Sequence, residues 1–299
     1  MSTPRFELSP TTRFADRAAD YASFRPSYPK AAIDAVLKGV RSDGPLTAAD
    51  IGAGTGISSR LLADRGVSIV AVEPNAAMRE SAAPHPGVTF IDGTAEATGL
   101  EASSVDLVLC AQAFHWFRPE EALAEFLRIL KPHGRLAFLI NERDNEDAAM
   151  RAYNAAIHAA ADRELSEGMR GTIDDALRSA GLEASPVSFP YAQSLSRDGL
   201  IGRARSASYV PKDGPRYDQL LRDLDAVWTT HHDECGRVTL GYRTFVWVVD
   251  SGSVSQGKSR KYRSVVTRGE SRSASGSKSQ KAPSTTSAVS LIARRRTRE

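Results

Sequence analysis

A glycine-rich run at residues 50–56, Asp-Ile-Gly-Ala-Gly-Thr-Gly, constrains the fold of this chain more than any other feature. Apolar residues precede the run, as in a buried strand, and residues 57–59 follow it as the first turn of a helix. Glycines allow a tight turn and let backbone N–H groups approach a ligand at the start of a helix. The sequence therefore predicts a strand, a nucleotide-type pocket and a helix in direct succession.

The apolar periodicity continues this alternation along the chain. It predicts helices at 30–40, 56–64, 76–81 and 119–130, and strands at 46–51, 67–72, 88–91, 105–111 and 135–140, with a turn at 131–134. Residues 148–181 read as mostly helical, followed by a strand at 186–191, more helix to 228 and a strand at 238–249. Such alternation implies right-handed crossovers. We predict an α/β fold, a Rossmann-like doubly wound sheet of seven mainly parallel strands.

Three parts are expected along the chain. Residues 1–29 form an N-terminal helical cover, and residues 251–299 form a basic, Ser-rich tail that cannot bury a core and should be disordered. Between them, residues 30–250 form one domain. Its cofactor-binding core spans 46–141, its helical acceptor-side region spans 142–235, and its last strand spans 238–249.

The overall charge of +3 hides an acidic body. The tail has 12 Lys and Arg against two Asp and Glu, so it carries +10 and leaves −7 on residues 1–250. An acidic body makes nucleic acid an unlikely partner of the folded part. The tail itself is either an altered reading frame or artificial extension, which we favour, or a basic arm that contacts phosphates. Removing it should leave activity intact.

Targeting and metal signals are weak. No run reaches the roughly 18 apolar residues that span a bilayer, and residues 1–5 lack a signal-peptide pattern, so we expect a cytoplasmic protein without a membrane partner. Cys110 and Cys235 belong to no CxxC pair and should be plain thiols. Every side chain at residues 231–235, His-His-Asp-Glu-Cys, is a possible metal ligand. We interpret them as a polar turn, because adjacent side chains point in different directions.

The identity of the loop's ligand follows from spacing and charge. A dinucleotide fold favours GxGxxG, whereas this loop has GxGxG and begins with the acidic Asp50, which suits a ligand with a cationic amino group. Glu73 ends the second strand, 17 residues after Gly56. One carboxylate can accept both hydroxyls of a ribose diol. The alternative is that Glu73 is only a solvated acid at a strand end.

These residues resemble the class I S-adenosylmethionine-dependent methyltransferases, in the small-molecule branch that includes trans-aconitate methyltransferase-like proteins, over most of residues 12–249. The resemblance implies that S-adenosylmethionine is the cofactor. It implies that the methionine part is held by the loop residues Asp50, Gly52, Gly54 and Gly56, the ribose by Glu73, and the adenine side by Thr94, Ala95 and Glu96. Ala53 and Pro74 are expected as further cofactor-binding residues. Many relatives carry Asp where this chain has Thr94, so a backbone or hydroxyl contact could replace the carboxylate there.

The segment 110–117 resembles the family's lining between cofactor and acceptor. Gln112 and Ala113 are expected beside the cofactor and Trp116 as a wall, while Phe114 and Phe117 are expected in the core. His115 is the candidate general base, with a hydrogen-bonded strand-end histidine as the alternative. Methyl transfer does not always need a base, because a carboxylate acceptor requires no deprotonation.

Residues 14–21 and 25–29 resemble the family's cover over the bound cofactor. Tyr21 and Tyr28 offer flat faces and hydroxyls, and Arg25 offers a two-pronged partner for a carboxylate. The alternative for Arg25 is a surface side chain before a proline-fixed turn. Tyr209 could close the acceptor pocket or serve packing.

The sequence thus predicts an enzyme that transfers a methyl group to a small-molecule acceptor, carboxylate or hydroxyl, by in-line displacement. Three alternatives stay open: a nicotinamide-dependent oxidoreductase, a nucleic-acid methyltransferase aided by the basic tail, and a non-catalytic cofactor-binding protein. The Asn/Asp-Pro-Pro-aromatic signature of amino-group methylation is absent. The chain is expected to be a monomer or homodimer.

Overall fold

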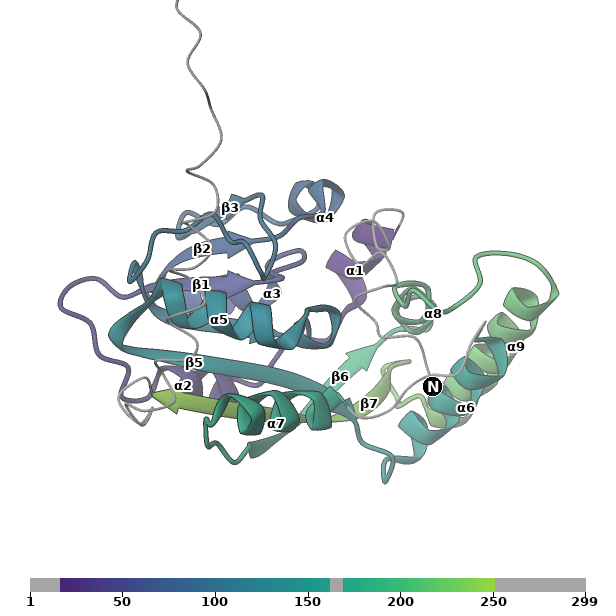
Figure 1. Ribbon diagram of the computed structural model, residues 1–299. Coiled ribbons are helices and arrows are strands. Elements are labelled where there is room, and N and C mark those ends of the chain that lie inside the picture. The colour runs from purple at the N-terminus through teal and green to yellow at the C-terminus, as the bar shows by residue number, and fades with distance from the viewer. Residues whose placement is uncertain (1–16, 162–168, 251–299) are drawn as a thin grey trace, which may run out of the picture.

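Seven strands form one sheet in the order β3-β2-β1-β4-β5-β7-β6 (Figure 1). The computed structural model describes residues 17–161 and 169–250, so the predicted tail disorder and the start of the cover lie outside the described residues. Strands β1 to β5 are parallel, and β7 is antiparallel to both β5 and β6. The predicted doubly wound, mainly parallel sheet is confirmed. The strands are β1 Thr47–Ile51, β2 Ser68–Val72, β3 Val88–Ile91, β4 Val105–Ala111, β5 Leu130–Arg143, β6 Val187–Leu195 and β7 Val238–Asp250.

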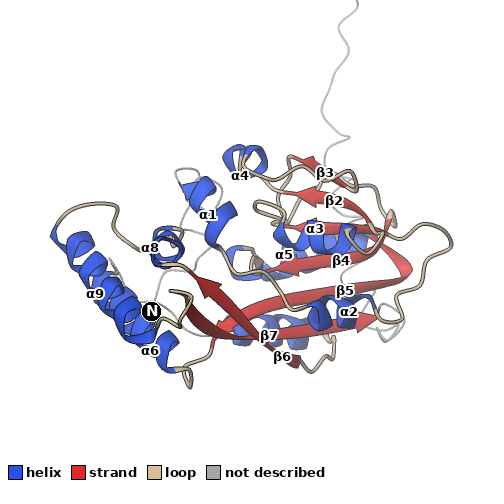
Figure 2. Ribbon diagram, turned by 180° about the vertical axis from the view of Figure 1, so that it is seen from behind, coloured by secondary structure: helices blue, strands red, loops and turns tan. Residues whose placement is uncertain are grey.

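Helices cover both faces of this sheet, as Figures 1 and 2 show from opposite sides. On one face lie α2 (Lys30–Leu37) and α3 (Ile57–Ala63), and on the other lie α5 (Pro119–Ile129) and α7 (Met169–Ala180), while α4 (Ala76–Glu80) connects β2 to β3. Each face has its own apolar core. The central strands β1 and β4 are buried along almost their whole length, as expected for parallel strands covered on both sides.

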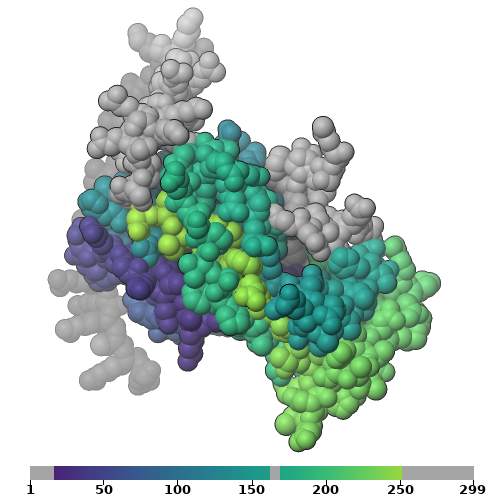
Figure 3. Space-filling view, turned by 90° about the horizontal axis from the view of Figure 1, so that it is seen from below, coloured from purple at the N-terminus to yellow at the C-terminus, as the bar shows by residue number. Residues whose placement is uncertain are grey.

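A third apolar core lies beyond the sheet. It joins α6 (Ala148–Ala160), α8 (Arg197–Arg205) and α9 (Pro215–His231) to one end of the β6–β7 pair. Helix α1 (Ala18–Phe24) packs against α8 (Figure 1), and α6 packs along α9 (Figures 1 and 3). In Figure 1 this helical group lies at the end of the sheet toward which the parallel strands point. Ligands of open α/β sheets bind at that end.

Several predicted boundaries differ from the structure, and the strand expected at 186–191 continues to Leu195. The turn expected at 131–134, ahead of the strand 135–140, lies within β5 instead. The pairing there steps from Val105↔Leu130 to Leu107↔Arg135, so these residues bulge out of register and do not separate the helix from the strand. Helix α2 ends at Leu37 and not at 40. Arg135 caps it, since its Nη1 donates to the backbone oxygens of Val36 (3.1 Å) and Lys38 (2.6 Å).

The described residues bear on two further expectations. After α9, a turn follows in which Asp233 Oδ1 accepts from the backbone N–H groups of Cys235 and Arg237, both at 2.9 Å, which confirms the polar turn. Among the described residues, no group of three His, Cys, Asp or Glu could hold a metal ion. In the same part of the chain, every helix is too short or too polar to cross a membrane.

Candidate active site

The glycine loop connects β1 to α3. Gly52, Gly54 and Gly56 have φ values of +69°, +57° and +72°, which L side chains rarely adopt. At Gly52 a Cβ would also lie 2.7 Å from Ala113 Cβ and 2.9 Å from Phe117 Cζ. The loop therefore requires glycine at this position, both for its conformation and for its close approach to the segment after β4.

Asp50 lies fully buried at the end of β1. Its Oδ2 accepts from the hydroxyls of Ser58 (2.7 Å) and Ser59 (2.6 Å), which fixes the start of α3 against the strand. Its Oδ1 is buried and forms no hydrogen bond with the described residues. Burial raises the pKa of Asp50, although the serine hydroxyls oppose the shift. One acceptor atom beside the loop thus remains available for a donor.

Glu73 lies against the same loop. Its Oε2 accepts from the Gly54 N–H and its Oε1 from the Asn75 N–H, both at 2.9 Å. The residue is only 8% exposed, and burial raises its pKa although both N–H groups oppose the shift. The alternative of a solvated strand-end acid is wrong. Pro74 is half-buried in the turn that leads to Asn75, whose Oδ1 caps α4 by accepting from Met78 N–H.

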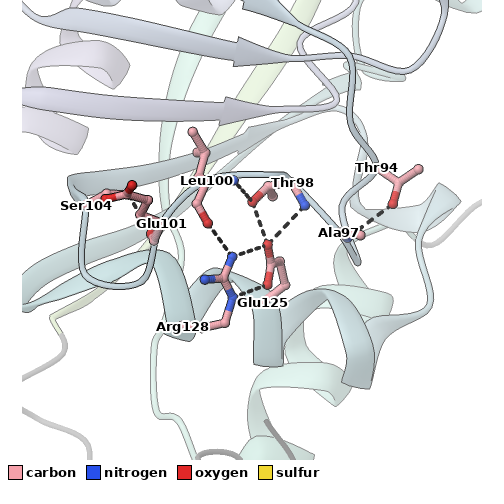
Figure 4. Close-up of polar contacts among 8 residues, drawn as sticks. All are labelled: Thr94, Ala97, Thr98, Leu100, Glu101, Ser104, Glu125 and Arg128. Atoms are coloured by element: carbon pink, nitrogen blue, oxygen red, sulfur yellow. Dashed lines mark hydrogen bonds and ion pairs between the residues drawn. The ribbon is translucent and has the colours of Figure 1, made fainter. Parts of the chain in front are cut away.

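The segment that we predicted on the adenine side is held by its own contacts and by α5 (Figure 4). Thr94 is exposed, and its Oγ1 accepts from the Ala97 N–H at 3.2 Å. Glu125 of α5 accepts from both the N–H (3.0 Å) and the hydroxyl (2.5 Å) of Thr98, and Arg128 holds the carboxylate from its other side. Ala95 is buried and Glu96 is half-buried, with Glu96 accepting from the N–H of Arg118, where α5 begins.

Gln112 follows β4 with a φ of +56°, an uncommon conformation for a residue other than glycine. Its Nε2 donates to the backbone oxygen of Asn141 at 3.0 Å, and its Oε1 is buried without a hydrogen bond among the described residues. Asn141 Nδ2 donates to Ser27 O (2.8 Å), and its Oδ1 accepts from Thr244 (2.6 Å). The sequence analysis missed Asn141, although a polar residue directly after an apolar strand was a readable signal.

The next residues form a 3-10 turn, η3 (Phe114–Trp116). Phe114 is buried and Phe117 packs edge-on against it, with ring centres 6.2 Å apart, as predicted for core residues. His115 and Trp116 are half-buried, and their ring centres lie 5.1 Å apart. The roles of His115 as a base and of Trp116 as a wall stay predictions.

The described part of the cover lies over the glycine loop. A Cβ at Gly54 would be 3.7 Å from the Tyr21 ring, and the guanidinium of Arg25 stacks on that ring at 4.6 Å. Arg25 Nη2 also donates to Ser206 O at 2.9 Å, so Arg25 is not a free surface side chain. Tyr28 is buried in the core beside α2, and burial raises its pKa well above the usual value.

The cover is anchored to α8. Arg17 donates to the backbone oxygens of Arg205, Ala207 and Val210 at 2.7–2.8 Å, which satisfies carbonyl groups at and after the end of that helix. Because Gly202 has no side chain, the ring of Phe24 can lie where a Cβ of residue 202 would otherwise be. These contacts hold α1 between the glycine loop and the helical group.

Tyr209 does not join the loop residues. Its hydroxyl accepts from Arg143 Nη2 at 2.6 Å, and it lies among Arg25, Arg143 and Arg203, which we call the arginine cluster. The sequence analysis named Arg25 and Tyr209 and missed Arg143 and Arg203. Neither carries a local signal, because both come close to Arg25 only in the folded protein.

One cavity, of about 300 Å³, opens on the α3 side of the cover. It does not include Asp50, Glu73 or Gln112, so it is distinct from the loop residues described above. Its lining residues are Ala22, Arg25, Ser27, Ile57, Arg60, Leu61, Asp64 and His85.

The fold and the loop are similar to those of one class of protein. The parallel strands, the GxGxG loop and the acid after β2 resemble those of the class I methyltransferases, the class that uses S-adenosylmethionine. Residues 49–138 match the family model described as a methyltransferase domain.

Curated relatives match this chain over less than half of its length. An "uncharacterized methyltransferase-like" protein of Schizosaccharomyces pombe is 40% identical over 134 residues, which cover 44% of this chain and 52% of the relative. An "uncharacterized methyltransferase" of Mycobacterium tuberculosis is 41% identical over 132 residues, covering 44% and 53%. The chain therefore matches these curated relatives over about half their length.

Solved structures share the fold at lower identity. One described as a "putative type II methyltransferase" from Anaeromyxobacter dehalogenans superposes with a TM-score of 0.53 at 24% identity, covering 76% of this chain and 97% of that one. This similarity supports the architecture of the sheet and its helices.

Proposed function

We propose that this protein transfers a methyl group from S-adenosylmethionine to a small-molecule acceptor with a carboxylate or hydroxyl group. The observation that carries the proposal is the pair of buried carboxylates, Asp50 and Glu73, on either side of a loop of three positive-φ glycines. This arrangement suits a ligand that presents cationic groups and a ribose diol, and it disfavours a pyrophosphate.

The residues present fit this cofactor. Glu73 is held by two backbone N–H groups in an orientation in which its remaining lone pairs can accept from ribose hydroxyls. Asp50 Oδ1, buried without a hydrogen bond, can accept from an amino group or from a water that bridges to it. When bound, the cofactor supplies an electrophilic methyl carbon on a sulfonium.

The protein's main contribution to such a reaction is positioning. In-line attack requires the acceptor to be held close and aligned with the methyl carbon. Gln112, Asn141 and Ser27 are joined by hydrogen bonds and connect the segment after β4 to the cover, which would limit both water access and acceptor motion. A hydroxyl acceptor would need a base, for which His115 stays our candidate; a carboxylate would need none.

The rival functions have less support. A nicotinamide-dependent oxidoreductase would place pyrophosphate against a loop that has two carboxylates beside it. A nucleic-acid methyltransferase would require a basic groove, whereas residues 1–250 carry −7. The trans-aconitate-like branch stays a proposal within the small-molecule class.

Calorimetric titration of the full chain with S-adenosylhomocysteine and, separately, with reduced nicotinamide dinucleotide tests the cofactor. We expect micromolar binding of the first alone and weaker binding by Glu73→Ala. Binding of the dinucleotide alone would make hydride transfer the better hypothesis. Radiolabelled methyl transfer to a set of small carboxylic acids and alcohols then tests the acceptor class.

A further inference from the structure

Three arginine side chains from distant parts of the chain converge on the acceptor side of the sheet. Arg143 ends β5 and Arg203 lies in α8, while Arg25 follows α1. Arg143 stacks over the Tyr153 ring at 5.6 Å and donates to Tyr209, and all three guanidinium groups act on the pKa of Tyr209. The arginine cluster is thus one electrostatic unit built around two phenols.

The guanidinium groups of the arginine cluster have no acidic partner in the part of the chain that the structure describes. Within the described ranges, no carboxylate lies within 4.0 Å of the guanidinium nitrogens of the arginine cluster. Their partners are phenols and neutral oxygens: Arg203 donates to Tyr242 (3.3 Å), Arg25 to Ser206 O (2.9 Å) and Arg143 to Asn154 (2.8 Å). Arg203 is only 4% exposed, and burial together with the charge of Arg203 lowers the pKa of Arg25. Uncompensated buried cations are costly, so their concentration here calls for an anion.

Two buried donors in this region also have no acceptor among the described residues. These are Nε of Arg25 and the hydroxyl of Tyr153, a residue that is fully buried. Burial raises the pKa of Tyr153 to about 12, so the phenol keeps its proton. A guanidinium N–H and a phenol O–H are both groups that bind an oxyanion well.

The arginine cluster is continuous with the proposed methyl-transfer site. Asn141, which accepts from Gln112, lies two residues before Arg143 on the same side of β5, a separation of about 7 Å along a strand. Arg25 lies two residues before Ser27, to which Asn141 donates. One small molecule could therefore contact both the Gln112 region and the arginine cluster.

From this geometry we propose that Arg25, Arg143 and Arg203, with Tyr153 and Tyr209, form an oxyanion subsite that binds a carboxylate of the methyl acceptor and orients the molecule toward Gln112. The inference rests on the proposed function for its link to methyl transfer. It adds that the acceptor is an anion, held at this subsite by a carboxylate.

The test uses citrate and sulfate as probes, titrated calorimetrically into the full chain in chloride buffer at fixed ionic strength, with and without S-adenosylhomocysteine. We expect citrate to bind and Arg143→Gln to raise its Kd about 10-fold or more, the usual cost of losing a charged hydrogen bond. Arg143→Lys should bind citrate more tightly than Arg143→Gln but more weakly than the unmodified protein, because lysine keeps the positive charge without the planar, two-pronged guanidinium group.

A matched control is Arg222→Gln on α9, an exposed arginine bonded to the side chain of Gln219, which should leave the Kd unchanged. The alternative is that the guanidinium groups only connect α1, α6 and α8. In that case citrate and sulfate will not bind, or Arg143→Gln will leave the Kd of citrate unchanged. Either result overturns the subsite. Binding of sulfate but not citrate would overturn the assignment to a carboxylate. Where Arg143→Gln does not fold, Arg143→Lys and Tyr209→Phe supply the same comparison.

Titration with S-adenosylhomocysteine separates this inference from the proposed function. Arg143→Gln should bind it as the unmodified protein does, because Arg143 does not contact the glycine loop. If the unmodified protein binds citrate in an Arg143-dependent way but not S-adenosylhomocysteine, the proposed function fails and the subsite stands.

Discussion

The two sides of the candidate active site differ in the sign of their buried charge. Around the glycine loop the buried charges are the carboxylates of Asp50 and Glu73, held by hydroxyls and backbone N–H groups. Around Tyr209 they are the guanidinium groups of the arginine cluster, held by phenols and neutral oxygens.

Under our two proposals, each side would bind a partner of opposite charge. The carboxylates would bind the amino group and ribose of the methyl donor, and the guanidinium groups would bind an anionic acceptor. Such a division would also disfavour the binding of either molecule on the wrong side.

The largest effect is expected from Glu73→Ala on the carboxylate side. Loss of two charged hydrogen bonds to a ribose should weaken S-adenosylhomocysteine binding by about 100-fold, measured calorimetrically. Glu80→Ala at the exposed end of α4 is the matched control and should change nothing. An unchanged affinity in Glu73→Ala would mean that the ribose is held elsewhere.

Gly52→Ala should break the loop itself. The new Cβ meets Ala113 and Phe117 at a φ of +69°, so we expect the free energy of unfolding to fall by about 1–3 kcal/mol and cofactor affinity to fall with it. Gly66→Ala separates the two causes, because Gly66 has a φ of +80° but open space around it. Equal losses in the two variants, measured by urea unfolding, would show that backbone strain alone is responsible.

Asp50→Asn removes the buried negative charge and keeps the size and shape of the side chain. The folded pKa of Asp50 is raised by burial, so the folded state holds the proton more tightly than the unfolded state. The ionised carboxylate therefore lowers stability at neutral pH, and this cost disappears as pH falls through the folded pKa. We expect Asp50→Asn to be more stable than the unmodified protein at pH 7, with a smaller gain at lower pH, and to bind S-adenosylhomocysteine more weakly. A loss of stability at pH 7 in urea titrations would contradict this reasoning.

The smallest effect is a pH dependence on the guanidinium side. Burial alone would raise the pKa of Tyr209, but Arg143, Arg203 and Arg25 outweigh it and lower that pKa below 10. A neutral phenol can donate to a carboxylate, whereas a phenolate repels it, so citrate affinity should fall a few-fold as pH rises through this pKa. Tyr209→Phe should flatten this pH profile; a profile that keeps its slope would assign the titration to another group.

The sequence predicted the carboxylate side better than the guanidinium side, for a physical reason. Strands 88–91 and 105–111 and the glycine loop follow from local periodicity and from backbone conformations that only glycine tolerates easily. The bulge at 131–134 depends on how β5 pairs with β4, which no local pattern encodes. The arginine cluster joins residues 25, 143 and 203, so its existence depends on the docking of α1, β5 and α8.

Asn141 also bears on the order in which the site can be assembled. Its three polar groups contact Ser27, Gln112 and Thr244, and two of these partners lie more than 100 positions from it. A chain growing from its N-terminus has made the cover and the glycine loop long before Thr244 exists, and contacts so distant in sequence form late. The loop can fold early, but Asn141 gains its Thr244 partner only after β7 has paired with β5, so the hydrogen bonds around Asn141 are complete only in the finished sheet.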